Sequence, residues 1–171
     1  MASGEYLKKR QSLESADTEI CSACGGACCK EASCAYAPAD FYNEKGNFDS
    51  KILRRAILLG RACLAFDIDG YFVVAPSVKH VKNRGFIGEV CDVDDDGPCS
   101  LLQSNGCLIK AVEDRPFYAA VLQPDERGLE HCTQPPELAY MISGFEFDDL
   151  SWKNYQDVLC NLAGEFKKEN Q

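Results

Sequence analysis

Residues 21–34 read CSACGGACCKEASC and hold five of the chain's eleven cysteines, namely Cys21, Cys24, Cys28, Cys29 and Cys34. The Cys21-x-x-Cys24 spacing is typical of a chelating turn, in which two neighbouring thiolates reach the same metal ion. Gly25 and Gly26 follow directly, and glycines let the backbone curl so that amide N–H groups point at the sulfur atoms. This stretch therefore predicts a metal-binding loop around which the rest of the fold is organised.

Three features favour metal binding over a framework of disulfides. An odd number of cysteines cannot be fully paired within one chain. Cys28 and Cys29 are adjacent, and a bridge between neighbours is far from relaxed disulfide geometry. The N-terminal residues lack the basic stretch and apolar run of a secretory signal, so we expect a cytoplasmic protein whose thiols stay reduced.

Further candidate ligands lie downstream of the first cluster. Cys91, Cys99 and Cys107 recur with seven residues between neighbours, and Cys132 follows His131. Cys63 and Cys160 stand alone on predicted helices, where we interpret them as small hydrophobic side chains. Cys91 and His131 remain open between a ligand role and a structural one.

The spacing of both clusters resembles that of the bacterial CxxCxxCC (YkgJ-like) family of zinc- or iron-chelating cysteine-cluster proteins. The first matching element is Cys21-Ser-Ala-Cys24-Gly-Gly-Ala-Cys28-Cys29, and the second is GPCSLLQSNGCLIKAVEDRP at residues 97–116. The second element carries the family's Cys-x-Leu, Gly-Cys and Arg-Pro pairs on Cys99, Leu101, Gly106, Cys107, Arg115 and Pro116. The resemblance covers roughly residues 20–135 and implies a metal centre.

The chain departs from the family pattern in two places. Three residues separate Cys24 from Cys28 where the family has two, and Ala119 stands where many members carry a cysteine. The resemblance then implies Cys132 as the replacement ligand, with Cys34 as the second choice. The predicted metal ligands are drawn from eight cysteines: Cys21, Cys24, Cys28, Cys29, Cys99, Cys107, Cys132 and Cys34.

Two kinds of centre suit such a ligand set. Zinc takes four ligands in a closed tetrahedron, whereas an iron–sulfur cluster takes four thiolates. The nearly pure cysteine set, with more thiols than four, favours a [4Fe–4S] cluster over zinc. We expect a non-catalytic metal-binding protein with a structural, sensing or accessory redox role, and no catalytic residue is assigned. The alternative is an enzyme or an enzyme's accessory subunit, oxidoreductase or methylase-associated, in which the cluster orders the active site.

Net charge and sequence motifs argue against several classes of binding partner. The net charge of −9 argues against nucleic acid, which requires clustered Lys and Arg. The chain's nearly apolar stretch at 56–68 is too short to span a membrane. A protein partner is left open, as is the oligomeric state. The acidic run at 92–97 begins like a calcium loop, but Gln103 occupies the place of its bidentate Glu, so a solvated turn is favoured.

The predicted fold is α+β and mostly helical: a small single domain with irregular cysteine-rich loops held by a metal centre. Residues 1–19 form an N-terminal arm with a short helix at 4–16, residues 20–147 the cysteine-cluster region, and residues 148–171 a C-terminal amphipathic helix packed on the same domain. Helices are also predicted over residues 49–66, from Arg115 to Leu122, and over residues 135–147. A strand is predicted over residues 69–76, and residues 84–91 form either a second strand or an extended lead into the acidic loop.

Overall fold

The computed structural model describes residues 8, 11, 12, 14, 17–31, 35–67, 69–76, 91, 92, 99, 101–104, 106–109, 114–125, 128–133 and 150–169. Helical residues outnumber strand residues in this part of the chain, which confirms an α+β class. The α-helices are α2 (Thr18–Cys24), α3 (Ala27–Glu31), α4 (Ser50–Leu58), α5 (Phe117–Ala120) and α8 (Gln156–Glu169). Two 3-10 helices are η1 (Pro38–Phe41) and η4 (Trp152–Tyr155). The strands are β1 (Cys63–Phe66), β2 (Phe72–Ala75), β3 (Cys91–Asp92), β4 (Leu102–Gln103), β5 (Gly106–Cys107), β6 (Gln123–Asp125) and β7 (Gly128–Thr133).

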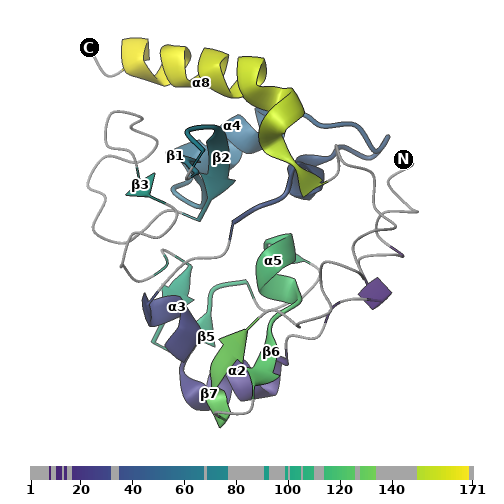
Figure 1. Cartoon of the computed structure of the whole chain (residues 1–171), viewed down its shortest axis with the longest axis vertical. Coiled ribbons are helices and arrows are strands. Elements are labelled where there is room, and N and C mark those ends of the chain that lie inside the picture. The colour runs from purple at the N-terminus through teal and green to yellow at the C-terminus, as the bar shows by residue number, and fades with distance from the viewer. Residues whose placement is uncertain are drawn as a thin grey trace.

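The described elements gather into two regions (Figure 1). The core region contains η1, α4, η4, α8 and a three-stranded sheet in the order β2-β1-β3. In this sheet β1 is antiparallel to β2 and parallel to β3. The cysteine region contains α2, α3, α5 and the two hairpins β4–β5 and β6–β7. The sequence predicted neither hairpin.

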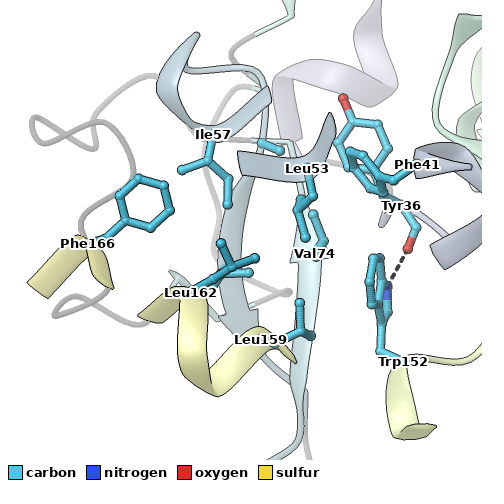
Figure 2. Close-up of a cluster of buried hydrophobic side chains, with 11 residues drawn as sticks. Tyr36, Phe41, Leu53, Ile57, Val74, Trp152, Leu159, Leu162 and Phe166 are labelled. Carbon is cyan, nitrogen blue, oxygen red and sulfur yellow. Dashed lines mark hydrogen bonds between the residues drawn. The ribbon is translucent and has the colours of Figure 1, made fainter. Parts of the chain in front are cut away.

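The core region is organised around the apolar face of the last helix (Figure 2). Leu159, Leu162 and Phe166 recur at steps of three and four along α8, so they fall on one face and are buried against Leu53 and Ile57 of α4. The Gln156 side chain fixes the start of α8 because its amide exchanges two hydrogen bonds of 2.8 Å with the backbone of Phe72 in β2. The core packing of this apolar stripe is as predicted. The helix predicted over residues 148–171 is shorter, because Trp152–Tyr155 form the 3-10 helix η4 and α8 spans Gln156–Glu169.

Tyr36 and Trp152 join distant parts of the core. The Trp152 indole Nε1–H donates to the backbone oxygen of Tyr36 over 2.8 Å, and the Tyr36 amide donates to the oxygen of Val74 over 2.8 Å (Figure 2). The Tyr36 ring lies 5.1 Å from that of Phe41, and the Phe41 ring lies 6.0 Å from that of Trp152. Buried indole N–H groups normally need such a partner, so this bond sets how η4 approaches the segment before η1.

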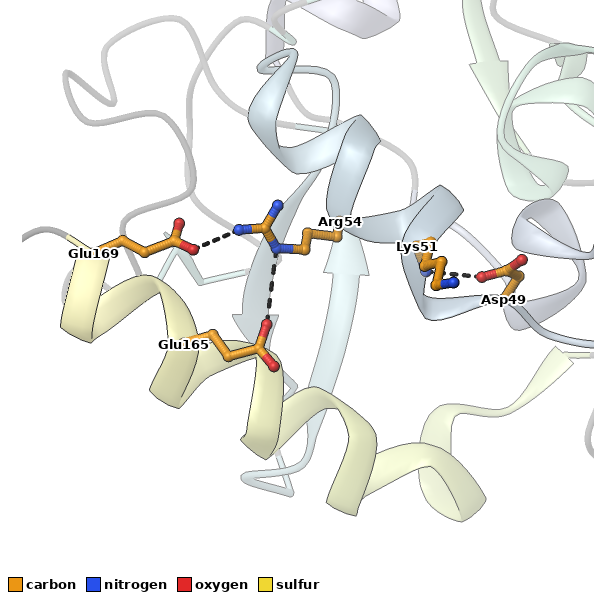
Figure 3. A network of polar contacts seen from close by, with 5 residues as sticks. All are labelled: Asp49, Lys51, Arg54, Glu165 and Glu169. Carbon is orange, nitrogen blue, oxygen red and sulfur yellow. Dashed lines mark hydrogen bonds and ion pairs between the residues drawn. The ribbon is translucent and has the colours of Figure 1, made fainter.

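The outer face of the helix pair α4–α8 carries a polar network (Figure 3). Arg54 of α4 contacts Glu165 of α8 at 3.7 Å and Glu169 at 2.5 Å. At the start of α4, the Asp49 carboxylate accepts a hydrogen bond from the Lys51 amide over 2.9 Å and caps the helix. Partly exposed ion pairs of this kind contribute about 0–1 kcal/mol, so the apolar contacts dominate the stability of this pair.

The prediction of one helix over residues 49–66 is wrong in its second half. The helix α4 ends at Leu58, and Cys63–Phe66 form strand β1 instead. Gly60 adopts φ +69, a left-handed conformation that ends a helix at little cost for glycine. The apolar residues that follow are Cys63, Leu64 and Ala65, which are all buried in the sheet, so the apolar run belongs to a buried strand.

Some of the other predicted helices and strands are present in the structure, and others are shorter or lie outside the described residues. The strand at 69–76 is present as β2, and the helix after Arg115 is present but short, ending at Ala120. Of residues 84–91, only Cys91 is described, as the first residue of β3. Of the N-terminal helix at 4–16, the structure describes Lys8, Gln11 and Ser12 as helical and Glu14 as non-helical. The helix predicted at 135–147 lies outside the described residues.

Across the described helices, none is both long enough and apolar enough to cross a lipid bilayer.

We predict that Leu159→Ala lowers the free energy of unfolding by about 2–5 kcal/mol, because it leaves a cavity in the core between α8 and α4. The neighbouring residue offers a matched control, since Cys160 is exposed on the same helix. Cys160→Ala is expected to change stability by about 0.5 kcal/mol or less. Urea unfolding followed by circular dichroism measures both, and equal losses would show that this face of α8 is not the core face.

Candidate metal centre

The first cysteine cluster is built on two short helices rather than on an open loop. Asp17 caps α2: its Oδ1 accepts from the amides of Glu19 at 2.7 Å and Ile20 at 3.1 Å. Cys21 and Cys24 lie three residues apart in α2, so they share one face of the helix. The Cys24 thiol donates to the Cys21 carbonyl over 3.7 Å. The CxxC pair is thus presented by a helical turn, which corrects the predicted loop and keeps both thiols on one side.

Two glycines turn the chain between α2 and α3. Gly25 and Gly26 have φ values of +67 and +72, in the left-handed region that favours glycine. The sequence anticipated this turn from the glycine pair. After it, α3 carries Cys28 and Cys29; the structure describes only the backbone of Cys28, and it does not describe Cys34.

The second cysteine cluster docks directly on the first through the backbone. The Cys99 amide donates to the Cys29 carbonyl over 2.9 Å. In hairpin β4–β5, Leu102 pairs with Cys107. A Cβ added at Gly106 would lie 3.4 Å from the Cys21 carbonyl oxygen, so β5 passes against the backbone of α2. This contact carries Cys107 to the side of α2 that bears Cys21.

The third segment reaches the same place through hairpin β6–β7. Cys132 in β7 pairs with Pro124 in β6, and β7 contacts both α2 and α3. His131 is also in β7, but only its backbone is described. The strand was not predicted, although Cys132 was named as a candidate ligand.

These segments enclose one cavity of about 50 Å³. Ile20, Ala119 and Leu122 contribute apolar wall, and Asp17, Gly26 and Arg115 complete it. Five cysteines from the three segments line the cavity: Cys21, Cys24, Cys29, Cys107 and Cys132. Ala119 and Cys132 therefore lie on the wall of the same cavity. The family resemblance implied that Cys132 replaces a ligand cysteine missing at position 119.

The remaining cysteines are distributed differently. Cys99 is buried beside the cavity but does not line it, and its backbone holds the two clusters together. Cys63 is buried in β1 with its thiol 3.9 Å from the Pro76 carbonyl oxygen, and Cys160 is exposed on α8. Neither Cys63 nor Cys160 lines the cavity. Cys63 nevertheless lies on a strand where a helix was predicted.

Arg115 is a cavity residue that was not predicted as part of the site. In the sequence it was noted only as a member of the Arg-Pro pair. It is 5% exposed and is the buried charged residue of the described chain. Its Nη1–H donates to the Cys21 sulfur over 3.5 Å, and its Nε–H donates to the Ile109 carbonyl over 3.1 Å. The signal available in the sequence was an arginine close to Cys107 and directly before a proline.

Asp40 places the segment that carries Arg115. One carboxylate oxygen of Asp40 accepts from the amide of Ala37 at 2.8 Å and from the amide of Phe117 at 3.0 Å. The second bond reaches across from η1 to the first residue of α5. Phe117 is fully buried with Ala37 and Val121, so this bond and this small cluster tie α5 to the core region.

Tyr36 lies between the core and the cysteines. Burial raises the pKa of the Tyr36 phenol, and the negative charges of Asp40, Cys99 and Cys107 raise it further. The phenol therefore stays protonated and donates to the Arg61 carbonyl at 3.4 Å. Burial, followed by the charge of Asp40, also raises the pKa of Tyr118. Both tyrosines thus act as neutral groups at physiological pH.

The donor set can be tested against the predicted metal centre. Soft thiolate ligands suit zinc and iron–sulfur clusters. Five cysteines, which could supply such ligands, line one cavity. As the side chains stand, no three His, Cys, Asp or Glu residues among those described form a group ready to hold a metal ion. The residues therefore fit by chemistry and by region, and their side chains would have to turn toward one another on binding.

Comparison with protein-family models, curated proteins and solved structures found no match to this chain.

We predict that Gly26→Ala destabilises the protein more than Gly70→Ala. Both residues have positive φ, so each substitution costs about 1–2 kcal/mol in backbone strain. At Gly26 the new Cβ would also lie 2.6 Å from Leu102, which is buried, whereas nothing lies within 4 Å at Gly70. Overpacking adds about 1–3 kcal/mol at Gly26. Urea unfolding of the two variants tests this, and equal stabilities would argue against the docking of the hairpin on this turn.

Proposed function

We propose that this chain is a metal-binding protein that uses four of the five cavity cysteines as thiolate ligands. The observation that supports this is the convergence of Cys21, Cys24, Cys29, Cys107 and Cys132, from three separate segments, on one small cavity. Packing alone gives no reason for five thiols to gather there, because each is a potential redox liability. Thiolates gathered around one space are the ligand pattern of structural zinc sites and iron–sulfur clusters.

The ligand set favours an iron–sulfur cluster over a single zinc ion. Structural zinc sites take four ligands and often include histidine. Here five cysteines and no histidine are among the described residues that line the cavity. Such a nearly pure cysteine set suits a [4Fe–4S] cluster. We therefore propose a [4Fe–4S] centre, with zinc as the competing outcome.

The role that we propose is structural or sensing, without catalysis. Among the described residues, the main apolar cluster lies between α4, the sheet and α8, and the large buried side chains of the cysteine region are Leu101, Leu102, Phe117 and Val121. Binding free energy at a metal centre adds directly to folding free energy when the site forms only in the folded chain. A centre at this cavity would hold α2, α3 and both hairpins together, so its loss would loosen this region.

Anaerobic purification followed by metal analysis and an ultraviolet–visible spectrum tests the proposal. We expect iron and sulfide in equal amounts and absorption at about 400 nm, as thiolate-bound clusters show. Colourless protein with stoichiometric zinc would support the metal site and show that it holds a structural zinc ion instead of an iron–sulfur cluster. Protein that binds neither metal after reconstitution with iron and sulfide, or with zinc, would overturn the proposed function.

Single substitutions assign the ligands. We predict that Cys24→Ser and Cys107→Ser each reduce the bound metal to a small fraction of the wild-type amount, since serine is a poor ligand for these soft metals. Cys160→Ser is the matched control, because Cys160 is exposed on α8 and outside the cavity. Cys132→Ser decides whether the third segment supplies the last ligand. Wild-type metal content in Cys24→Ser would refute its assignment.

A further inference from the structure

We infer that Asp40 is the latch of the cysteine-lined cavity and that the cavity opens to larger molecules when this latch is released. The latch holds residues 115–122, which we call the wall segment, against the core region. Asp40 itself lies on η1 and is not among the described residues that line the cavity. The inference concerns the fold of the chain, so it stands or falls independently of the proposed metal centre.

The wall segment forms one side of the cavity. Three of its residues line the cavity, namely Arg115, Ala119 and Leu122. The segment continues directly into β6, where Pro124 pairs with Cys132 of β7. In Figure 1, α5 lies between the core region and the hairpin β6–β7. The position of Cys132 on the cavity wall therefore depends on the position of the wall segment.

The wall segment has two faces with different tasks. Phe117 and Val121 are four residues apart, and both are fully buried in one cluster with Ala37 of the core region. Ala119 and Leu122 are three residues apart and line the cavity. Two residues along a helix correspond to a rotation of about 200°, so Ala119 lies opposite Phe117. One face is thus anchored to the core while the other closes the cavity.

The Asp40 carboxylate fixes the start of this segment. One of its oxygens accepts from the amide of Phe117 at 3.0 Å and from the amide of Ala37 at 2.8 Å. The first amides of a helix have no acceptor within the helix, so this oxygen serves the start of α5 and the start of η1 together. Hydrogen bonds from N–H groups to a carboxylate are stronger than those to a neutral acceptor. The latch therefore joins the wall segment to the core region.

Release of the wall segment would expose the thiols. The cavity measures about 50 Å³, and Cys107 and Cys132 on its wall are half-buried, so a reagent of several heavy atoms gains full access to them only when a wall moves. Folded chains open locally in cooperative units at a lower free energy than global unfolding. The wall segment and the hairpin β6–β7 form such a unit, because they are continuous in the chain and Asp40 holds their start.

Asp40→Ala removes the acceptor, and thiol labelling measures the opening. Full-length protein is reduced, freed of metal with a chelator and treated with N-ethylmaleimide, and the rate at each cysteine is read by mass spectrometry of peptides. We expect Cys107 and Cys132 to react about tenfold faster than in the wild type, since loss of a hydrogen bond to a charged group shifts the opening equilibrium by about that factor. Cys160, which is exposed on α8, is expected to react at the wild-type rate.

Asp49→Ala is the matched control that separates local opening from global unfolding. Asp49 is also a carboxylate that caps a helix, but it caps α4 in the core region. Its bond to the Lys51 amide breaks in global unfolding and stays intact when only the wall segment opens. We expect Asp49→Ala to speed the labelling of Cys63, which is buried in β1, about fivefold. The control is expected to leave Cys107 and Cys132 at their wild-type rates.

Two results would overturn the inference. Unchanged labelling of Cys107 and Cys132 in Asp40→Ala would show that reagents reach the thiols by another route. Equal acceleration of both thiols by Asp49→Ala would show that they react only from the unfolded chain.

A second variant covers the case in which Asp40→Ala is not recovered folded. Asp40→Asn keeps one oxygen and loses the charge, so about threefold faster labelling of Cys107 and Cys132 supports the latch, and the wild-type rate overturns it. Metal analysis of the untreated protein tests the proposed function separately, because the labelled protein carries no metal.

Discussion

The backbone hydrogen bond from the Cys99 amide to the Cys29 carbonyl is the contact on which the geometry of the site depends. It joins segments about seventy positions apart in the chain and sets the second cysteine cluster against the first. The approach is close because Gly26 and Gly106 lack side chains where Leu102 and the backbone of Cys21 come nearest. Any larger residue at Gly26 would have to displace a buried leucine. The glycines therefore matter to the site as much as the cysteines do.

The core region supports the site through the segment that contains Tyr36 and Asp40. Tyr36 receives the indole N–H of Trp152 on its backbone oxygen, and Asp40 receives the amide of Phe117. The first bond anchors the segment to the C-terminal helices, and the second anchors the start of α5, two residues beyond Arg115. The position of the buried guanidinium is thus linked to a core that packs through ordinary apolar contacts. Such a core can hold a cavity of thiols in place while their side chains remain able to rearrange.

Local sequence patterns predicted helices and strands well where contacts between residues close in the sequence determine them. The spacing of Leu159, Leu162 and Phe166 indicated the last helix. The run from Arg61 to Phe66 was misread because a short apolar stretch suits a buried helix or a buried strand equally well. Its strand state depends on pairing with Val73 and Val74 of β2, which is a tertiary property. The hairpin that carries Cys132 was missed for a similar reason, since residues Gly128–Thr133 alternate too weakly to signal a strand.

By itself, the sequence determined the chemical character of this protein: clustered thiols, a glycine turn after CxxC and a candidate set of eight cysteines. Spacing along a chain reports only neighbours, so it could not show which distant thiols meet. Only the tertiary structure decided that Cys21, Cys24, Cys29, Cys107 and Cys132 share a cavity while Cys99 stands beside it. It also decided that Arg115 is buried against Cys21. The physical reason is that convergence of separate segments depends on how helices and hairpins pack, and burial of a charge has no local sequence signature.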